Sequence, residues 1–235
     1  PVPAGGPRHH RRGRVTHRPN SSGLDYYPYI CTIINMDLAR PFAALTPTLD
    51  GDVLRVLANT SRPMTAPTVA ALAGNGSEAG IRKALQRLAG QGLVTRERTG
   101  HHDSYLLNRG HLLADAVLAI AAARLTLQDR ITATVTHWRI QPIFLALFGS
   151  VLTPEMRPDS DVDIAIIRPD DVPVDDPNWV DQCIHLAERG QEWTGNDVRF
   201  FELSATEASN AAEHGERVVA DIRERGLALV GEFPR

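Results

Sequence analysis

The chain contains 235 residues, of which 43% are hydrophobic and 6% are aromatic. This composition excludes a fibrous, collagenous or wholly disordered protein, and the length is sufficient for two small hydrophobic cores. The longest apolar-rich stretch, 112–123, is interrupted by Asp115 and falls short of the roughly 20 residues that cross a bilayer, so no membrane contact is expected.

The formal net charge of −3 hides an uneven distribution along the chain. Residues 1–149 hold 17 of the 25 Lys and Arg but 9 of the 28 Asp and Glu, so this stretch sums to +8 and the remainder to −11. A basic first half is typical of a segment that binds a polyanion or is simply solvated, whereas an acidic second half can hold cations.

Residues 1–35 are rich in Pro, Gly, Arg, His and Ser and lack a periodic apolar face, so we expect a disordered basic tail. The tail is either an arm that touches nucleic acid or a solvated segment, and a natural start at Met36 is an alternative. Its apolar block, 29–34, is too short for the core of a signal peptide. Cys31 and Cys183 give no disulfide framework and fit a reducing compartment, so we expect the cytoplasm.

The next stretch shows the spacing of apolar residues that is typical of short helices, followed by two strands. The expected elements are helices from Asp50, over 65–73 and from the N-cap candidate Ser77, and strands over 93–98 and 104–107.

This order of elements, together with LAGQGLV at 88–94, resembles the winged helix-turn-helix domain. The resemblance covers roughly residues 48–110, and we assign residues 36–110 to this domain. It implies that the third helix enters the major groove of DNA while the hairpin contacts the backbone. The implied DNA-binding residues are Arg82, Lys83, Gln86, Arg87, Arg96 and Arg98. Because residues 77–110 are only modestly basic, the alternative is that the domain dimerises or docks a partner.

Residues 111–139 carry apolar side chains at three- and four-residue steps. This spacing predicts one long connecting helix, or two helices with a kink. Its apolar stripe could equally form the seam of a homodimer, and Pro142 closes it.

Two apolar runs of strand length then flank a group of polar residues. The first, 143–148, ends at Gly149 and Ser150, and the second, 164–167, follows Asp161 and Asp163. Because side chains alternate along a strand, the two aspartates are expected on one face, where they repel each other unless a divalent cation lies between them. Carboxylates with water and substrate phosphates are the usual ligands of Mg²⁺.

A third acid, Asp197, begins another run of alternating apolar residues and is expected on a neighbouring strand. Three carboxylates from two strands can hold two metal ions, one at the attacking hydroxyl and one at the triphosphate.

The residues LFGS at 147–150 and DSDVDIAI at 159–166 resemble the DNA polymerase β-like nucleotidyltransferase superfamily, particularly its small bacterial members. The resemblance covers roughly residues 140–232 and implies an α+β fold in which residues 140–235 form a mixed β-sheet with flanking helices. It implies a nucleoside triphosphate (NTP) substrate and Mg²⁺ or Mn²⁺. The implied nucleotide-binding residues are Gly149, Ser150 and Ser160, and the implied metal-binding and catalytic residues are Asp161, Asp163 and Asp197.

The segment after Ser150 departs from that family. Many relatives have Ala-Arg-Gly there, whereas this chain has Val-Leu-Thr-Pro at 151–154. The usual basic residue is therefore missing, and Arg157 is a candidate to replace it.

The leading hypothesis is a metal-dependent nucleotidyltransferase that transfers a nucleoside monophosphate to a hydroxyl of protein, RNA or a small molecule. The second is a DNA-binding regulator, for example of a toxin-antitoxin type, whose nucleotidyltransferase fold senses a nucleotide or binds a partner. A narrower third is an adenylyltransferase that modifies aminoglycosides. Expected partners are an NTP, DNA through residues 48–110 and a second copy of the chain.

Overall fold

The computed structural model describes residues 35–99 and 102–234. The predicted basic tail, apart from Asn35, and Cys31 within it lie outside the described residues. Within the described ranges, none of the helices has the length and apolar character needed to cross a membrane.

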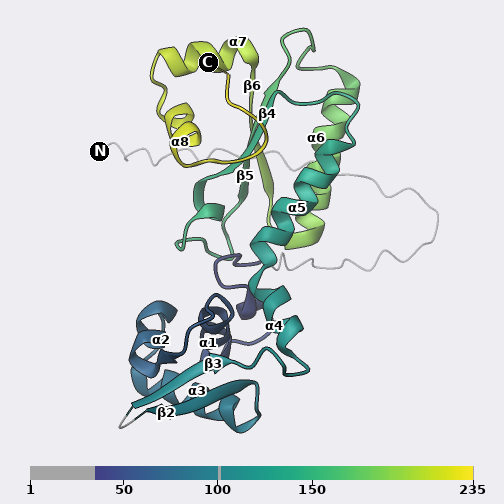
Figure 1. Ribbon diagram of the computed structural model, residues 1–235. Helices are drawn as coiled ribbons and strands as arrows, with labels where there is room; N and C mark the ends of the chain where they lie inside the picture. The colour runs from purple at the N-terminus through teal and green to yellow at the C-terminus, as the bar shows by residue number, and fades with distance from the viewer. Residues whose placement is uncertain (1–34, 100–101, 235) are drawn as a thin grey trace, which may run out of the picture. The chain divides into compact units, whose positions relative to one another are not determined.

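The N-terminal part, residues 41–121, is built from helices and a small antiparallel sheet (Figure 1). Its elements are η1 Pro41–Ala44, α1 Leu49–Ala58, β1 Met64–Thr65, α2 Ala66–Ala73, α3 Glu78–Gly90, β2 Val94–Thr99, β3 His102–Leu107 and α4 Ala114–Ala121. The strands pair in the order β1-β3-β2. Ser77 caps α3 by accepting a hydrogen bond from the Gly80 amide, as its sequence position predicts.

Helix α4 is separated at Ala122 from α5, Ala123–Thr136, so residues 111–139 contain two helices rather than one. The break coincides with a change of packing partner. Val117 of α4 joins the core of the N-terminal part, whereas Leu127 and Ile131 of α5 join a separate core. A single straight helix would have to pack its apolar side chains against both cores, so the break at Ala122 lets each helix pack against its own core.

The C-terminal part, residues 123–231, contains α5 and a four-stranded mixed sheet of order β6-β5-β4-β7. The elements after α5 are β4 Phe144–Phe148, η2 Gly149–Leu152, β5 Val162–Arg168, α6 Pro177–Thr194, β6 Val198–Ser204, α7 Ala205–Glu213, α8 Arg217–Arg225 and β7 Leu227–Gly231. Strand β5 runs antiparallel to β4 and parallel to β6, and β7 pairs antiparallel with β4.

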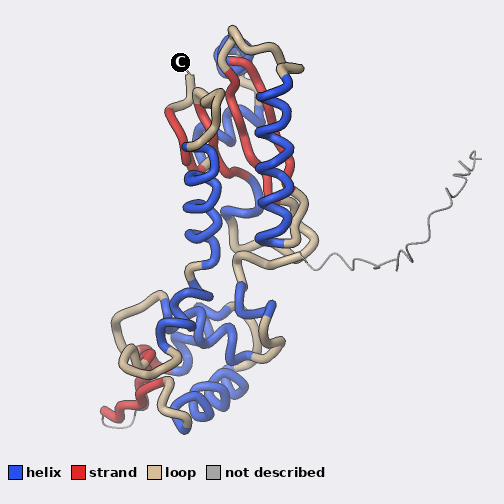
Figure 2. Tube along the Cα trace, turned by 90° about the vertical axis from the view of Figure 1, so that its right-hand side faces the viewer, coloured by secondary structure: helices blue, strands red, loops and turns tan. Residues whose placement is uncertain are grey.

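Helices cover both faces of this sheet, and Figure 2 shows the long helices running alongside the strands. Leu147 and Ile164 pack on one face in the core that includes α5 and α6. Ala146 and Ala165 belong to the core that includes Ile222 of α8 and Ala208 of α7. The alternation of apolar side chains to opposite faces explains why β4 and β5 read as continuous apolar runs.

The segment before α1 contacts both cores. The Met36 amide donates to the Thr194 carbonyl and to Asn196 Oδ1, both at 3.0 Å, and Leu38 is buried in the core of the C-terminal part. Phe42 is buried in the core of the N-terminal part. Residues 36–42 therefore form a second connection between the cores, besides the α4–α5 junction.

Candidate functional site

Gly149 lies against the carboxylate of Asp163. Strand β4 ends at Phe148, whose register partner on β5 is Asp163. Gly149 then turns the chain with a φ of +73°, and a Cβ atom at this position would lie 2.8 Å from Asp163 Oδ2. The chain therefore requires glycine here for two reasons, because a side chain would be strained by the positive φ and would collide with the carboxylate.

Asp161 lies close enough to Asp163 to affect its ionisation. Asp161 directly precedes β5 and Asp163 is its second residue. Burial raises the pKa of the Asp163 carboxyl, the negative charge of Asp161 raises it further, and the Arg199 guanidinium partly opposes both. The structure thus brings together two of the three predicted acids.

Arg199 is a member of this cluster that the sequence analysis missed. It is the register partner of Asp163 across the parallel β5–β6 pair. Its Nη1 atom lies 2.8 Å from Asp161 Oδ2, although 67% of its side chain remains exposed. The only signal in the sequence was its position two residues after Asp197, where alternation along β6 returns a side chain to the same face.

Asp197 was expected to complete a three-carboxylate cluster. It is exposed, directly precedes β6, and its Oδ1 atom accepts a hydrogen bond from Gln191 Nε2 at 3.1 Å. Among residues 35–99 and 102–234, no three His, Cys, Asp or Glu side chains are grouped so that they could hold a metal ion. A role for Asp197 as metal ligand or base stays a prediction.

The donor set fits one divalent cation better than two. Asp161 and Asp163 offer adjacent carboxylate oxygens. Burial and the charge of Asp161 both disfavour the ionised form of Asp163 and raise its pKa, and a bound cation would favour that form. Arg199 already compensates part of this charge through Asp161. A cation held by the two aspartates would need water and substrate phosphates as its other ligands, which is the usual arrangement for Mg²⁺.

The segment after Ser150 starts in the hydrophobic core with Val151, whereas the following Leu152 and Thr153 are partly exposed. Val151 in η2 is fully buried with the residues that pack against α6. Arg157, the candidate replacement, uses its backbone amide to donate to Ser160 Oγ at 3.0 Å. The Arg157 side chain is exposed and makes no hydrogen bond or ion pair with the part of the chain that the structure describes.

Asn196 fixes the loop that precedes the two aspartates. It is completely buried, and its Nδ2 atom donates to the carbonyls of Pro158 and Ser160 at 3.3 and 2.8 Å. Its Oδ1 atom accepts from Met36. Asn196 therefore holds Ser160 in place through the backbone, whereas the sequence analysis assigned Ser160 only to nucleotide binding.

A cavity of about 550 Å³ opens beside Gly149, and its opposite wall is α8. Arg217 and Arg225 line it together with Asp221 and Glu224. Arg225 pairs with Asp221 at 3.3 Å, whereas Arg217 is exposed and makes no ion pair or hydrogen bond with any described residue. A volume of this size suits a mononucleotide-sized ligand.

The six residues predicted to contact DNA lie on α3 and β2 and are all exposed. Three of them are already paired with acids: Arg82 with Glu78, Arg87 with Asp50, and Arg96 with Asp103. Lys83, Gln86 and Arg98 make no such contact with a described residue.

Comparison with known proteins supports the assignment of the C-terminal part. Searches of curated proteins and of solved structures return no match to this chain. A scan of family models matches residues 131–219 to the family described as Polymerase beta, Nucleotidyltransferase. The matched range contains the Gly149 turn, Asp161, Asp163, Arg199 and the first turn of α8. Residues 131–219 are therefore similar to the nucleotidyltransferase domains of the polymerase beta family.

Proposed function

We propose that the C-terminal part binds an NTP and transfers its nucleoside monophosphate to a hydroxyl group. The observation that carries this proposal is the apposition of the Gly149 turn to the Asp161–Asp163 pair, inside the range that matches the family model. A glycine turn lets phosphate oxygens approach the backbone closely, and two carboxylates at the same point are suited to phosphoryl chemistry.

Each residue of the cluster has a distinct part in the proposed reaction. Gly149 and Ser150 receive the triphosphate, and Asp161 and Asp163 would hold a divalent cation, Mg²⁺ or Mn²⁺. That ion, when bound, supplies positive charge that stabilises the reacting phosphates. The acceptor oxygen bonds to the α-phosphorus, the bond from that phosphorus to the bridging oxygen breaks, and pyrophosphate leaves. Asp197 is the candidate to accept the proton of the hydroxyl. It is exposed and directly precedes β6, just as Asp161 directly precedes the parallel strand β5.

Label transfer tests this proposal directly. Purified protein is incubated with each α-labelled NTP, Mg²⁺ and a cell extract, and the protein, RNA and small-molecule fractions are separated. We expect one fraction to retain label with the unaltered chain and to lose it with an Asp161→Asn/Asp163→Asn variant. An Asp170→Asn variant, changed at an exposed carboxylate that bonds Thr206, serves as the matched control and should retain transfer. No transfer with any NTP would contradict the proposal.

A second candidate function is a regulator in which the nucleotidyltransferase fold binds a nucleotide without transferring it. The Arg199–Asp161 ion pair favours this alternative, since it gives one of the two carboxylates a cationic partner within the protein. We propose for both candidates that the N-terminal part is a winged helix domain. Its three helices followed by the β2–β3 hairpin support that assignment.

DNA binding by α3 and the hairpin can be tested with a gel shift on the upstream region of the gene. Because Arg82, Arg87 and Arg96 are paired with acids, we expect a Lys83→Ala/Arg98→Ala variant to lose more affinity than an Arg82→Ala/Arg87→Ala variant. Each lost phosphate contact should also reduce, by about one, the slope of the logarithm of the binding constant against the logarithm of the salt concentration. A gel shift that neither variant changes would show that α3 and the hairpin do not make the DNA contact.

A further inference from the structure

A cationic cavity separate from the Asp161–Asp163 pair lies among the described residues. Its volume is about 580 Å³, and its lining includes Arg40, Arg55, Asn75 and Arg124. None of the described residues that line it is acidic. It shares no lining residue with the cavity beside Gly149, so it is a separate candidate binding site.

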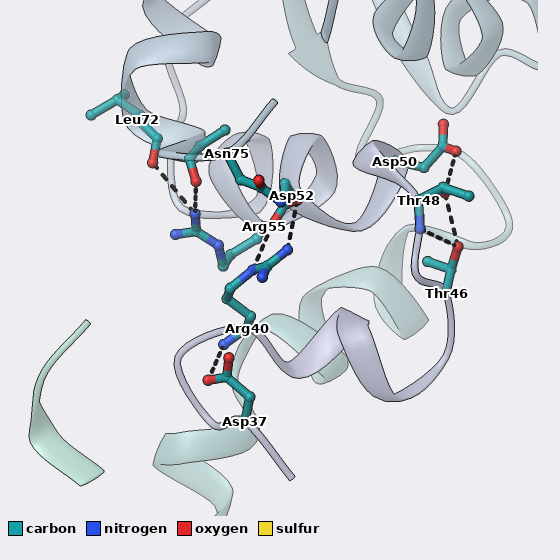
Figure 3. Close-up of polar contacts among 10 residues, drawn as sticks. Asp37, Arg40, Thr46, Thr48, Asp50, Asp52, Arg55, Leu72 and Asn75 are labelled. Carbon is teal, nitrogen blue, oxygen red and sulfur yellow. Dashed lines mark hydrogen bonds and ion pairs between the residues drawn. The ribbon is translucent and has the colours of Figure 1, made fainter. Parts of the chain in front are cut away.

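Arg40 contributes little free charge because Asp52 neutralises it. The Nε and Nη2 atoms of Arg40 each donate to one carboxylate oxygen of Asp52 at 3.0 Å, and Asp52 is 4% exposed (Figure 3). Asn75 Nδ2 donates to the same carboxylate at 3.2 Å. The Arg40 side chain is 42% exposed, but its two hydrogen bonds to the buried Asp52 fix its position in the cavity wall.

Arg55 brings an uncompensated positive charge to the cavity. Figure 3 shows its guanidinium directed at the end of α2, where Nη2 donates to the carbonyls of Leu72 and Ala73 at 3.4 and 3.0 Å. Its Nε atom is buried and has no hydrogen-bond partner among the residues that the structure describes. A buried donor without an acceptor is unfavourable, and a guanidinium held only by carbonyls retains its full charge.

Arg124 adds a second uncompensated charge from α5. Its Nη1 atom donates to the Leu152 carbonyl at 3.3 Å, and no described carboxylate pairs with it. The side chain is half-buried, so solvent compensates its charge only partly. Leu152 itself lines the cavity and ends η2, the short helix that begins at Gly149.

We propose that this cavity binds a small molecule that carries several phosphate groups, of about the size of a nucleoside triphosphate. Two guanidiniums without carboxylate partners and one orphaned donor are suited to phosphate oxygens, which accept several charge-assisted hydrogen bonds. The volume lies in the range typical of small-molecule sites. The ligand would contact residues from α1, α5 and the segment after η2, so it would link the N-terminal part to the turn that begins at Gly149.

Calorimetric titration of the full chain with inorganic tripolyphosphate in EDTA and 0.15 M salt tests the proposal. We expect binding by the unaltered chain, and a decrease in affinity of about tenfold or more for Arg124→Ala, because one charge-assisted contact is lost. Arg124→Lys, which keeps the charge, should lose less. Arg130→Ala changes an exposed arginine on the same helix that contacts Trp193, and it should bind as the unaltered chain does.

Titrations with ATP and AMP separate the two sources of phosphate. Tighter binding of ATP than of tripolyphosphate would identify a nucleotide, whereas equal binding would identify a polyphosphate. An Asp161→Asn/Asp163→Asn variant should still bind tripolyphosphate, so failure of the proposed catalytic function would leave this result intact. No binding by the unaltered chain, equal binding by Arg124→Ala, or full displacement by a DNA duplex would overturn the proposal. Thermal unfolding of each variant checks that it is folded.

Discussion

The carboxylate of Asp163 occupies the space where a side chain at Gly149 would lie. A Cβ atom on Gly149 would approach Asp163 Oδ2 to 2.8 Å. Gly149 therefore both ends β4 and leaves the space that Asp163 Oδ2 occupies.

Gly149→Ala should both destabilise the protein and weaken nucleotide binding. The positive φ alone costs about 1–2 kcal/mol for a residue with a side chain, and displacement of Asp163 adds to it. Gly215→Ala is the matched control, because Gly215 has a φ of +67° but open space around its Cβ position. Gly149→Ala should lower the free energy of unfolding in urea, and the affinity for NTP, more than Gly215→Ala does. Equal effects would mean that the contact with Asp163 is unimportant.

Asp163→Asn should raise the thermal stability of the nucleotide-free protein in EDTA at pH 7. Because burial and Asp161 raise the pKa of Asp163 in the folded state, its ionised form destabilises the fold at neutral pH. We expect an increase in Tm of a few degrees. The increase should shrink as the pH falls from above the raised pKa of the folded state to below the ordinary pKa of an aspartate, where the carboxyl is protonated in both the folded and the unfolded protein. Asp170→Asn should have the opposite sign, because hydrogen bonds from Thr206 lower the pKa of Asp170. A decrease in Tm for Asp163→Asn would contradict the electrostatic argument.

Arg199→Ala should increase the affinity of the protein for Mn²⁺. The Arg199 guanidinium competes for Asp161, and an exposed ion pair of this kind is worth up to about 1 kcal/mol, or a factor of about five. Electron paramagnetic resonance of free Mn²⁺ measures the affinity without requiring turnover. Arg199→Lys should leave it near the unaltered value, as should Arg189→Ala, which breaks an ion pair with Glu192 on α6. An unchanged affinity for Mn²⁺ in Arg199→Ala would show that Arg199 and Mn²⁺ do not compete for Asp161.

Asn196→Ala should reduce the free energy of unfolding by about 1–3 kcal/mol, because the carbonyls of Pro158 and Ser160 lose the donor that the buried Asn196 side chain supplies. Asn196→Asp keeps an acceptor for Met36 and still removes the donor, so it should be destabilised too. Asn178→Ala, at an exposed position, should change stability by less than about 0.5 kcal/mol. Denaturant titration measures all three, and an unaffected Asn196→Ala variant would show that the loop does not depend on this residue.

The Cys183 thiol should resist alkylation in the folded protein. Burial, and secondarily the charge of Glu202, raises its pKa to about 12. The reactive thiolate is then scarce at pH 8, where an ordinary thiol would be partly ionised. A Cys31→Ser variant isolates the reaction, and iodoacetamide labelling followed by mass spectrometry should detect modification of Cys183 only after denaturation. Rapid labelling of the native protein would contradict the assigned burial.

The sequence predicted those features that depend on neighbouring residues. The Gly149-Ser150 turn between two apolar strands, the Asp161–Asp163 pair at the start of β5 and the Ser77 cap all follow from local periodicity and backbone preference. The mixed sheet was expected from the resemblance, and the family match supports the nucleotidyltransferase domain.

Only the tertiary structure decided which distant side chains meet. The β5–β6 register places Arg199, rather than a third acid, opposite Asp163, and α6 places Gln191 against Asp197. The packing of α4 and α5 on separate cores decided between the two predicted alternatives, one long helix or two, and placed the break at Ala122. Arg55 and Arg124, 69 positions apart in the sequence, line one cavity. Such contacts depend on strand register and helix packing, which no local pattern of residues encodes.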